Sequence, residues 1–339
     1  MALILVITAV VSAALFAWIS IRMNSEFPKR KVEVQIKEGM SARAIGVLLQ
    51  EKKVIKSALL FVLAIKRRGV ESDIKPGTYI FATGMDYDKV IDKLIKGPAI
   101  NYIKLTLPEG WTAKQMADRV SSITKIDRDE YLGLSTDDSL WMEYPFLMQS
   151  GAPVVNLEGF LYPQTYRILN KTTARELVKM QLDQFMKATS DLNWSNAESL
   201  GRTPYEIIII ASLIERETVV KDERPIVASV IYNRLAKNMR LQIDASVQYA
   251  LPVWKKRLTY EDLKVDSPYN TYRNPGLPPG PICNPGYESI KAALNPAKTD
   301  YLYYVLAPDN SGRHVFTSTY DEFLKAKAQY DAARRQQVN

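Results

Sequence analysis

Two glutamates at the end of an apolar stretch are the residues of this sequence best suited to proton transfer. Glu215 and Glu217 follow a run that contains Ile207, Ile208, Ile209, Ile210, Leu213 and Ile214. Burial disfavours the charged form of a carboxyl group, and a carboxyl that stays protonated can act as a general acid. The two glutamates lie about 200° apart around a helix, so they cannot both address one substrate atom. Each glutamate would share a helix face with residues of the apolar run, so helical periodicity does not indicate which of the two is catalytic.

The sequence contains few of the residues that other common catalytic mechanisms need. Cys283 is the only cysteine and His314 the only histidine, so no intrachain disulfide can form and no zinc cluster of His and Cys ligands can be assembled. A Ser-His-Asp arrangement would have to use His314, whose surroundings look like a strand entering a turn. Carboxylates are therefore the expected proton carriers, and no metal and no cofactor is expected.

Two later segments have the composition of a binding groove. Residues 266–286 combine prolines, which stiffen the backbone, with tyrosines and asparagines, which supply stacking faces and hydrogen bonds for a sugar. A rigid surface connection is the alternative. Gln242, Asp244 and Ser246 alternate with other residues, as in an extended segment whose polar side lines a cleft or faces solvent.

The elements that would hold these residues follow from the hydrophobic pattern. Residues 205–219 predict a helix buried on most sides. An amphipathic helix precedes it, opened by a capping box of Thr173 and Glu176. The helix after it is expected to be capped by Asp222, with Asn233 on its apolar face. Residues 121–155 are polar and irregular and predict a connection into a second domain.

A smaller α+β module is predicted upstream. Residues 32–36 and 77–81 read as strands, and residues 40–50 and 86–95 carry apolar residues at helical spacing. Residues 2–21 are apolar or small and uncharged, close to the roughly 20 residues that cross a bilayer as a helix. We interpret this run as a membrane anchor; a cleaved signal peptide is the alternative. Arg22, Lys29, Arg30 and Lys31 follow it, and by the positive-inside tendency these charges favour a cytoplasmic body.

The composition is that of a folded chain with an anionic partner. Apolar residues make up 47% and charged residues 24% of the 339 residues, and the net charge is +8. Acidic glycan, a lipid surface or nucleic acid would each suit that charge. Nucleic acid is set aside, because the basic residues are scattered and do not alternate with aromatic residues as in single-strand binding platforms.

Seven segments carry a wider resemblance: Glu158-Gly159-x-x-x-Pro163-x-Thr165, Ala211-Ser212-Leu213-Ile214-Glu215-Arg216-Glu217-Thr218, Val227-Ala228-Ser229-Val230-Ile231-Tyr232-Asn233-Arg234-Leu235, Met239-Arg240-Leu241-Gln242-x-Asp244, Tyr269-Asn270-Thr271-Tyr272, Gly276-Leu277-Pro278-Pro279-Gly280-x-Ile282 and Asn295-Pro296-Ala297. In order and spacing they resemble the endolytic murein transglycosylases, also called the YceG-like family. The family pattern places the catalytic glutamate second in the Glu-x-Glu pair, which implies Glu217. Position 164 is Gln where the family often has Asp, so no ionisable role is expected there.

The resemblance implies an α+β fold in five parts: a transmembrane anchor (residues 1–21), a juxtamembrane linker (22–31), a LysM-like module (32–98), a connecting α/β region (99–155) and a lysozyme-like catalytic domain (156–339). Because peptidoglycan lies outside the cell membrane, the body is expected in the periplasm, held by one pass through the inner membrane despite the flanking charges. The implied partners are peptidoglycan strands and cell-wall synthesis enzymes.

The implied reaction uses one carboxyl group twice. Glu217 would protonate the glycosidic oxygen between N-acetylmuramic acid (MurNAc) and N-acetylglucosamine (GlcNAc). It would then take the proton of the MurNAc C6 hydroxyl, which closes a 1,6-anhydro ring. The expected substrate-binding residues are Asn233, Gln242, Asp244, Tyr269, Asn270, Thr271 and Tyr272. Two alternatives remain: a hydrolase that pairs Glu217 with Glu158 or Asp244, and a glycan-binding scaffold without activity.

Overall fold

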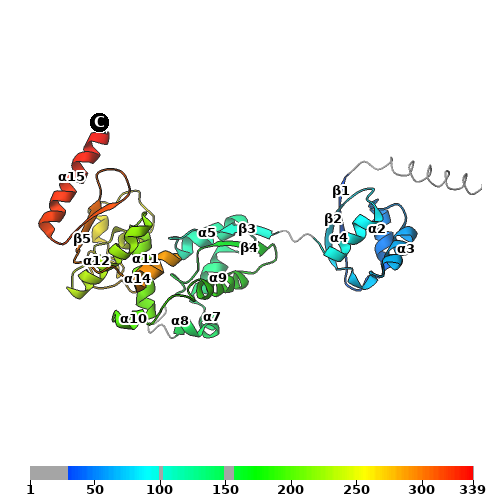
Figure 1. The fold of residues 1–339 in the computed structure, drawn as a ribbon, viewed down its shortest axis with the longest axis horizontal. Coiled ribbons are helices and arrows are strands. Elements are labelled where there is room, and N and C mark those ends of the chain that lie inside the picture. Colours follow the sequence, from blue (N-terminus) through cyan, green and yellow to red (C-terminus); the bar gives the residue numbers. More distant parts are fainter. Residues whose placement is uncertain (1–29, 99–101, 149–155, 339) are drawn as a thin grey trace, which may run out of the picture. The chain divides into compact units, whose positions relative to one another are not determined.

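The chain forms two compact units, Met1–Asn101 and Tyr102–Asn339. The computed structural model describes residues 30–98, 102–148 and 156–338 (Figure 1). Each unit has a hydrophobic core of its own. Helices and strands are mixed in both, which confirms the predicted α+β class.

The first unit is a two-stranded antiparallel sheet with helices. Its elements are, in order, β1 (Lys31–Ile36), α2 (Ala42–Glu51), α3 (Ala58–Arg68), the 3₁₀ turn η1 (Glu71–Asp73), β2 (Gly77–Ala82) and α4 (Tyr87–Lys96). β1 pairs with β2 from Lys31 opposite Ala82 to Ile36 opposite Gly77. Alternation along both strands buries every second side chain, so the helices cover one face of the sheet. The two strands and two helices predicted here are confirmed.

The first half of the second unit contains a strand pair that is distant in sequence. Its elements are β3 (Tyr102–Thr106), α5 (Ala113–Ile123), α6 (Arg128–Gly133), η2 (Leu134–Thr136), α7 (Asp138–Glu143), α8 (Pro145–Met148), β4 (Thr165–Leu169) and α9 (Ala174–Ala188). β3 pairs with β4 in antiparallel register. The predicted capping box of Thr173 and Glu176 opens α9.

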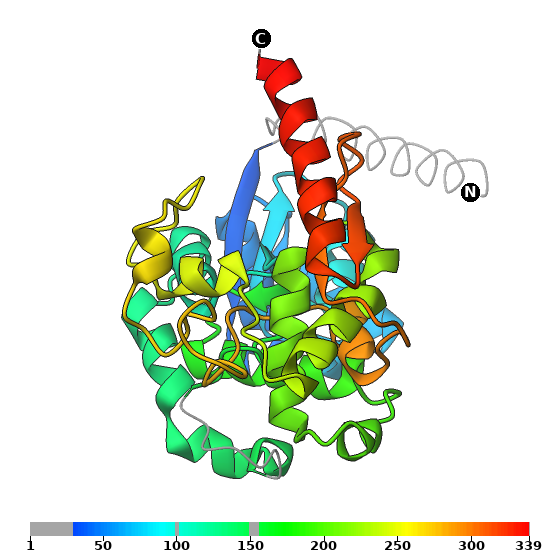
Figure 2. The same ribbon diagram turned by 90° about the vertical axis from the view of Figure 1, so that its left-hand side faces the viewer.

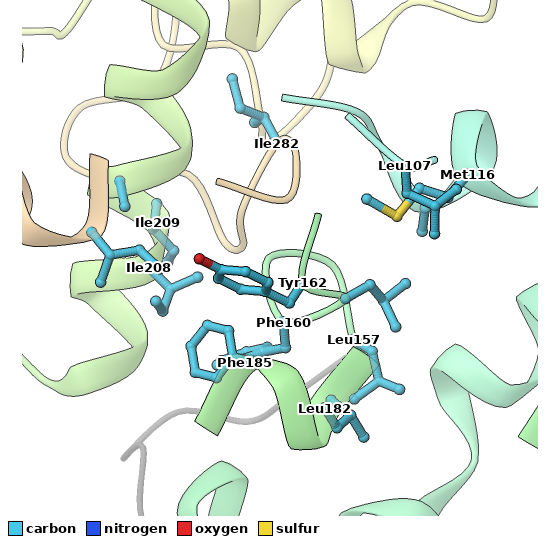
Figure 3. Close-up of a cluster of buried hydrophobic side chains, with 14 of the residues drawn as sticks. Leu107, Met116, Leu157, Phe160, Tyr162, Leu182, Phe185, Ile208, Ile209 and Ile282 are labelled. Atoms are coloured by element: carbon cyan, nitrogen blue, oxygen red, sulfur yellow. The ribbon is translucent and has the colours of Figure 1, made fainter. Parts of the chain in front are cut away.

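The second half is built around α11. Its elements are α10 (Asn196–Ser199), α11 (Pro204–Glu217), η3 (Lys221–Glu223), α12 (Arg224–Ala236), α13 (Asp244–Ala250), η4 (Asp262–Lys264), α14 (Tyr287–Leu294), β5 (Tyr303–Leu306), β6 (His314–Thr317) and α15 (Tyr320–Val338). α11 packs against α12, α13 and α14. Figure 3 shows Ile208 and Ile209 of α11 meeting the aromatic rings of Phe160, Tyr162 and Phe185. Figure 2 shows α15 projecting away from the strands β5 and β6 on which it begins.

Two local predictions are wrong. Residues 121–155 were expected to be irregular, yet this segment contains α6, α7 and α8, and Tyr131, Leu140 and Leu147 are buried in the core of the second unit. Asp222 does not cap α12: the helix follows Glu223 without a side-chain cap, and Asp222 instead accepts a hydrogen bond from Arg313 Nη2 at 2.7 Å.

The predicted membrane anchor, residues 1–21, lies outside the described residues, as does most of the predicted linker. Among the helices that the structure describes, none combines the length and the apolar character needed to cross a bilayer.

Candidate active site

α11 carries both candidate glutamates to the edge of a buried core. A capping box of Thr203 and Glu206 opens the helix, with Pro204 in its first turn, where a missing N–H is harmless. Every residue from Ile207 to Ile214 is buried. The helix ends at Glu217, since Thr218 is extended, with φ of −115°. The last turn therefore presents its acidic side chains at the boundary between core and surface.

Glu215 is fully engaged in holding neighbouring elements. Its Oε1 accepts from Arg224 Nη2 at 3.2 Å, and both side chains are less than one tenth exposed. Its Oε2 accepts from the backbone N–H of Gly286 at 3.0 Å and from the hydroxyl of Ser289 at 2.7 Å. With both oxygens occupied, Glu215 joins α11 to α12 and α14, and neither oxygen is left to face a substrate.

Glu217 has a different environment. The residue is half-buried, and within the described part of the chain its carboxyl group accepts one hydrogen bond, from the hydroxyl of Tyr304 at 2.8 Å. Burial raises the pKa of Glu217, and the nearby charge of Asp244 raises it further. The Tyr304 hydrogen bond and the charges of His314 and Arg234 act in the opposite direction. A carboxyl with a raised pKa that still reaches the surface is suited to donate a proton.

Tyr304, which no motif of the sequence indicates as a site residue, comes from β5. Burial raises the pKa of its hydroxyl well above the ordinary value, so the phenol stays neutral and donates to Glu217. Its ring lies edge-on to the imidazole of His314 on the paired strand β6, with centroids 5.3 Å apart. His314 Nδ1 is 2.8 Å from Glu223 Oε2, so the histidine is held beside the phenol.

Asn233 and Arg234 on α12 fix the start of β5. Asn233 Nδ2 donates to the carbonyl oxygens of Thr299 at 2.8 Å and Tyr301 at 2.9 Å. Arg234 Nε donates to the carbonyl of Leu302 at 2.6 Å. The amide N–H donors of Asn233 are thus used within the protein, where they position the strand that carries the phenol.

Asp244 and Tyr272 form a second polar pair near Glu217. The hydroxyl of Tyr272 donates to Asp244 Oδ1 at 2.6 Å. Asp244 begins α13 and is exposed, as is Gln242, whose φ of +52° is unusual for a residue with a side chain. Both Asp244 and Tyr272 interact electrostatically with Glu217. The structure therefore brings Glu217, Asp244 and Tyr272 together, with Gln242 beside them in the chain.

Of the remaining predicted binding residues, Asn270 and Thr271 are buried and Tyr269 is half-buried. Asn270 is fully buried and donates to the carbonyls of Leu263 and Val265 at 2.9 and 2.8 Å. Thr271 is buried, and its hydroxyl accepts from the backbone N–H of Ile243 at 2.9 Å. Tyr269 packs its ring on Tyr249, with centroids 4.8 Å apart. These residues shape the loop, and their predicted role in substrate binding stays a prediction.

Glu158, proposed above as a second acid, is also internal. It is 4% exposed and accepts from the backbone N–H of Ala113 at 2.9 Å and from Asn284 Nδ2 at 2.8 Å. Burial raises its pKa to about 8. The contacts show that Glu158 anchors the first turn of α5 and the loop around Asn284.

Known proteins resemble this chain in sequence and in fold. The model of the YceG-like family matches residues 34–329. The endolytic murein transglycosylase of Bacillus subtilis is 37% identical over 317 residues, covering 91% of this chain and 87% of that protein. That of Streptococcus pneumoniae R6 is 32% identical, covering 82% of this chain and 54% of that protein. The crystal structure of a YceG-like protein from Listeria monocytogenes has 35% identity and a TM-score of 0.60, covering 88% of this chain and 99% of that one.

Proposed function

This chain belongs to the YceG-like family, and we propose that it is a peptidoglycan lytic transglycosylase that cleaves within glycan strands, with Glu217 as its single acid and base. One observation supports the choice of Glu217 above all others. Of the two glutamates that end α11, Glu215 is occupied by an arginine, a backbone N–H and a serine, whereas Glu217 has one hydroxyl partner and a raised pKa.

The proposed reaction proceeds in two proton transfers. Glu217, whose protonated form is favoured by burial, donates its proton to the glycosidic oxygen between MurNAc and GlcNAc, and the bond from that oxygen to the MurNAc anomeric carbon breaks. The anomeric carbon then carries oxocarbenium-like charge. The resulting carboxylate accepts the proton of the C6 hydroxyl of the same MurNAc, whose oxygen bonds to the anomeric carbon. No water is consumed, and Glu217 ends protonated, as it began.

Neighbouring residues are proposed to stabilise the charged species that form in these two steps. The hydroxyl of Tyr304 stabilises the carboxylate and orients it between the two transfers. Asp244 carries negative charge close to the site, and it would stabilise the positive sugar intermediate. Gln242 and Tyr272 are proposed to contact the glycan, while Asn233 acts through β5.

Membrane anchoring through residues 2–21, a body in the periplasm and a glycan-binding, LysM-like role for the first unit are also part of the proposal. The strand–helix–helix–strand order from β1 to β2 is compatible with such a module. Cleavage of nascent strands close to the inner membrane would limit their length and would bring the enzyme near cell-wall synthesis enzymes.

Product analysis tests the proposal. Peptidoglycan strands are digested with the soluble body, residues 22–339, and with its Glu217→Gln variant, and the products are analysed by mass spectrometry. Products ending in 1,6-anhydro-MurNAc, absent with the variant, are expected. Reducing-end products would assign a hydrolase, for which exposed Asp244 is a candidate second carboxylate. Absence of cleavage products with both proteins would assign a scaffold, and equal cleavage by both would show that Glu217 is not the catalytic acid.

A further inference from the structure

One helix of the first unit exposes apolar side chains that its own core does not use. α3 has the sequence Ala-Leu-Leu-Phe-Val-Leu-Ala-Ile-Lys-Arg-Arg, and it buries only Phe61 and Ile65. The side chains of Leu59, Leu60 and Leu63 are 69, 47 and 53% exposed. Single exposed leucines are common on protein surfaces, but three on one helix of eleven residues form a patch that suggests a partner.

The three leucines and two basic residues lie on one face of α3. At about 100° per residue, Leu59, Leu60 and Leu63 fall within an arc of about 100°. Arg67, one turn further along, returns to the same arc, and Lys66 falls about 20° outside it. We call these five residues the α3 face. α3 contains no acidic residue, so its exposed side is apolar first and basic at its C-terminal end.

The basic residues of this face are available to an anionic partner. Arg68 is engaged with Asp92 at 2.7 Å and with Asp88 at 3.4 Å. Arg67, in contrast, reaches Asp88 only at 3.9 Å with its side chain 76% exposed, and Lys66 is exposed. Residues 30–98 hold 14 Lys and Arg against 8 Asp and Glu, a net charge of +6 of the +8 carried by the whole chain.

The position of this unit in the chain identifies the partner. Only residues 22–29 separate the proposed anchor from the first described residue, Arg30. Eight residues span at most roughly 28 Å, and a unit of this size has a radius of gyration of about 11 Å. The tether therefore holds every face of the unit within reach of the membrane surface.

We propose that the α3 face docks on an anionic lipid surface beside the anchor, with the leucines at the boundary of headgroups and acyl chains and with Lys66 and Arg67 on lipid phosphates. This inference rests on the membrane anchor of the proposed function. An apolar face flanked by basic residues is the pattern of helices that lie in the membrane interface. Because α3 is already folded and packed, docking requires no further ordering of its backbone.

The test places a fluorescent probe on the full chain in vesicles. Leu63→Cys labelled with bimane reports on the α3 face, and Gln35→Cys, exposed on β1, is the matched control on the same unit. Figure 1 shows α3 on the side of the unit away from the strands. The only native thiol, Cys283, is buried, so the unlabelled wild-type chain sets the background. Vesicles contain anionic phospholipid with acyl chains brominated near the headgroup.

We expect strong bromine quenching and a blue shift at residue 63 and neither at residue 35. The double variant Lys66→Gln and Arg67→Gln should lower the ratio of docked to free states about 30-fold, since each basic residue near an anionic surface contributes about a factor of five. Replacing the anionic lipid by neutral lipid should lower the ratio of docked to free states to a similar extent.

Three outcomes would overturn the proposal, and they are distinguishable. Equal quenching at residues 63 and 35 means that the α3 face does not meet lipid. A blue shift at residue 63 without bromine quenching means that protein, such as a second copy of the chain, covers it. Failure of the wild-type chain to float with vesicles refutes the anchor, and with it the docking, but leaves the catalytic proposal in place.

Discussion

The hydroxyl of Tyr304 donates to Glu217 at 2.8 Å and opposes the pKa increase that burial causes. In Tyr304→Phe the carboxylate loses this donor, so the pKa of Glu217 should rise. A hydrogen bond to a charged group contributes about 1.5–3 kcal/mol, so we expect kcat/KM on isolated glycan strands to fall roughly tenfold to hundredfold. Because the first step needs protonated Glu217, the alkaline limb of the pH profile should move to higher pH.

A matched control is Tyr303→Phe. Tyr303 points to the other face of β5, where it stacks on Phe323 with centroids 5.5 Å apart. This variant should keep both the rate and the pH profile of the wild type. An unchanged alkaline limb in Tyr304→Phe would show that the phenol does not act on Glu217 during turnover.

Glu215 should matter for stability, in contrast to Glu217. Removing one partner of a buried ion pair costs about 3–5 kcal/mol, and Glu215 and Arg224 are both buried. Glu215→Ala should therefore lower the free energy of unfolding by that amount in urea titrations. The free energy of unfolding of Glu217→Gln should stay within about 1 kcal/mol of the wild-type value, although this variant loses activity. Adding Arg224→Met to Glu215→Ala should recover part of the loss; if Glu215→Ala is as stable as wild type, the structural role assigned to it is wrong.

Among the elements, α5 depends on a buried carboxyl. Glu158 accepts from the backbone N–H of Ala113 in the first turn, yet burial raises its pKa to about 8. The folded state therefore binds a proton that the unfolded state releases between about pH 4.5 and 8. The stability from this group is fully present below about pH 4.5 and is lost as the pH rises to about 8, by up to about 1.4 kcal/mol per unit.

Glu158→Gln removes this titration while it keeps an oxygen for the same donors. Its free energy of unfolding, measured in urea at several pH values between 5 and 8.5, should decline less with pH than that of wild type. Parallel declines in the two proteins would show that Glu158 is already ionised in the folded state at neutral pH.

Local signals were sufficient for much of the element structure. Capping residues such as Thr173, and apolar residues at helical or alternate spacing, predicted α9, α11 and, in the first unit, β1, α2, β2 and α4. The wrong predictions concern segments whose structure is determined by tertiary contacts. Residues 121–155 look polar because α6, α7 and α8 each bury only one side, and β3 is completed by β4 about sixty residues later in the chain.

The site could be predicted only in part. Glu217 and Asp244 lie in recognisable motifs, but the sequence did not choose between Glu215 and Glu217 without the family resemblance. The distinction lies in partners such as Ser289 and Tyr304, which are 74 and 87 residues distant. No helical phase or motif spacing encodes those contacts. A tyrosine in a short strand such as β5 looks like any core aromatic residue until the fold places its hydroxyl.

For the whole molecule, separate cores imply separate roles. Every residue assigned to catalysis lies in the second unit, whereas the α3 face and the short tether lie in the first. The first unit should then determine where the enzyme acts, and the second unit should determine what it does to a strand that it meets.

A pair of core variants tests this division. Ile91 and Leu213 are both fully buried, in the first and second cores respectively. Either substitution to Ala should cost about 2–5 kcal/mol in its own unit, seen as faster proteolysis of that unit. On short soluble strands Ile91→Ala should keep the wild-type kcat/KM, because no group at Glu217 depends on that core, while Leu213→Ala, within α11, should lower it. A loss of turnover in Ile91→Ala equal to that in Leu213→Ala would mean that the first unit takes part in cleavage itself.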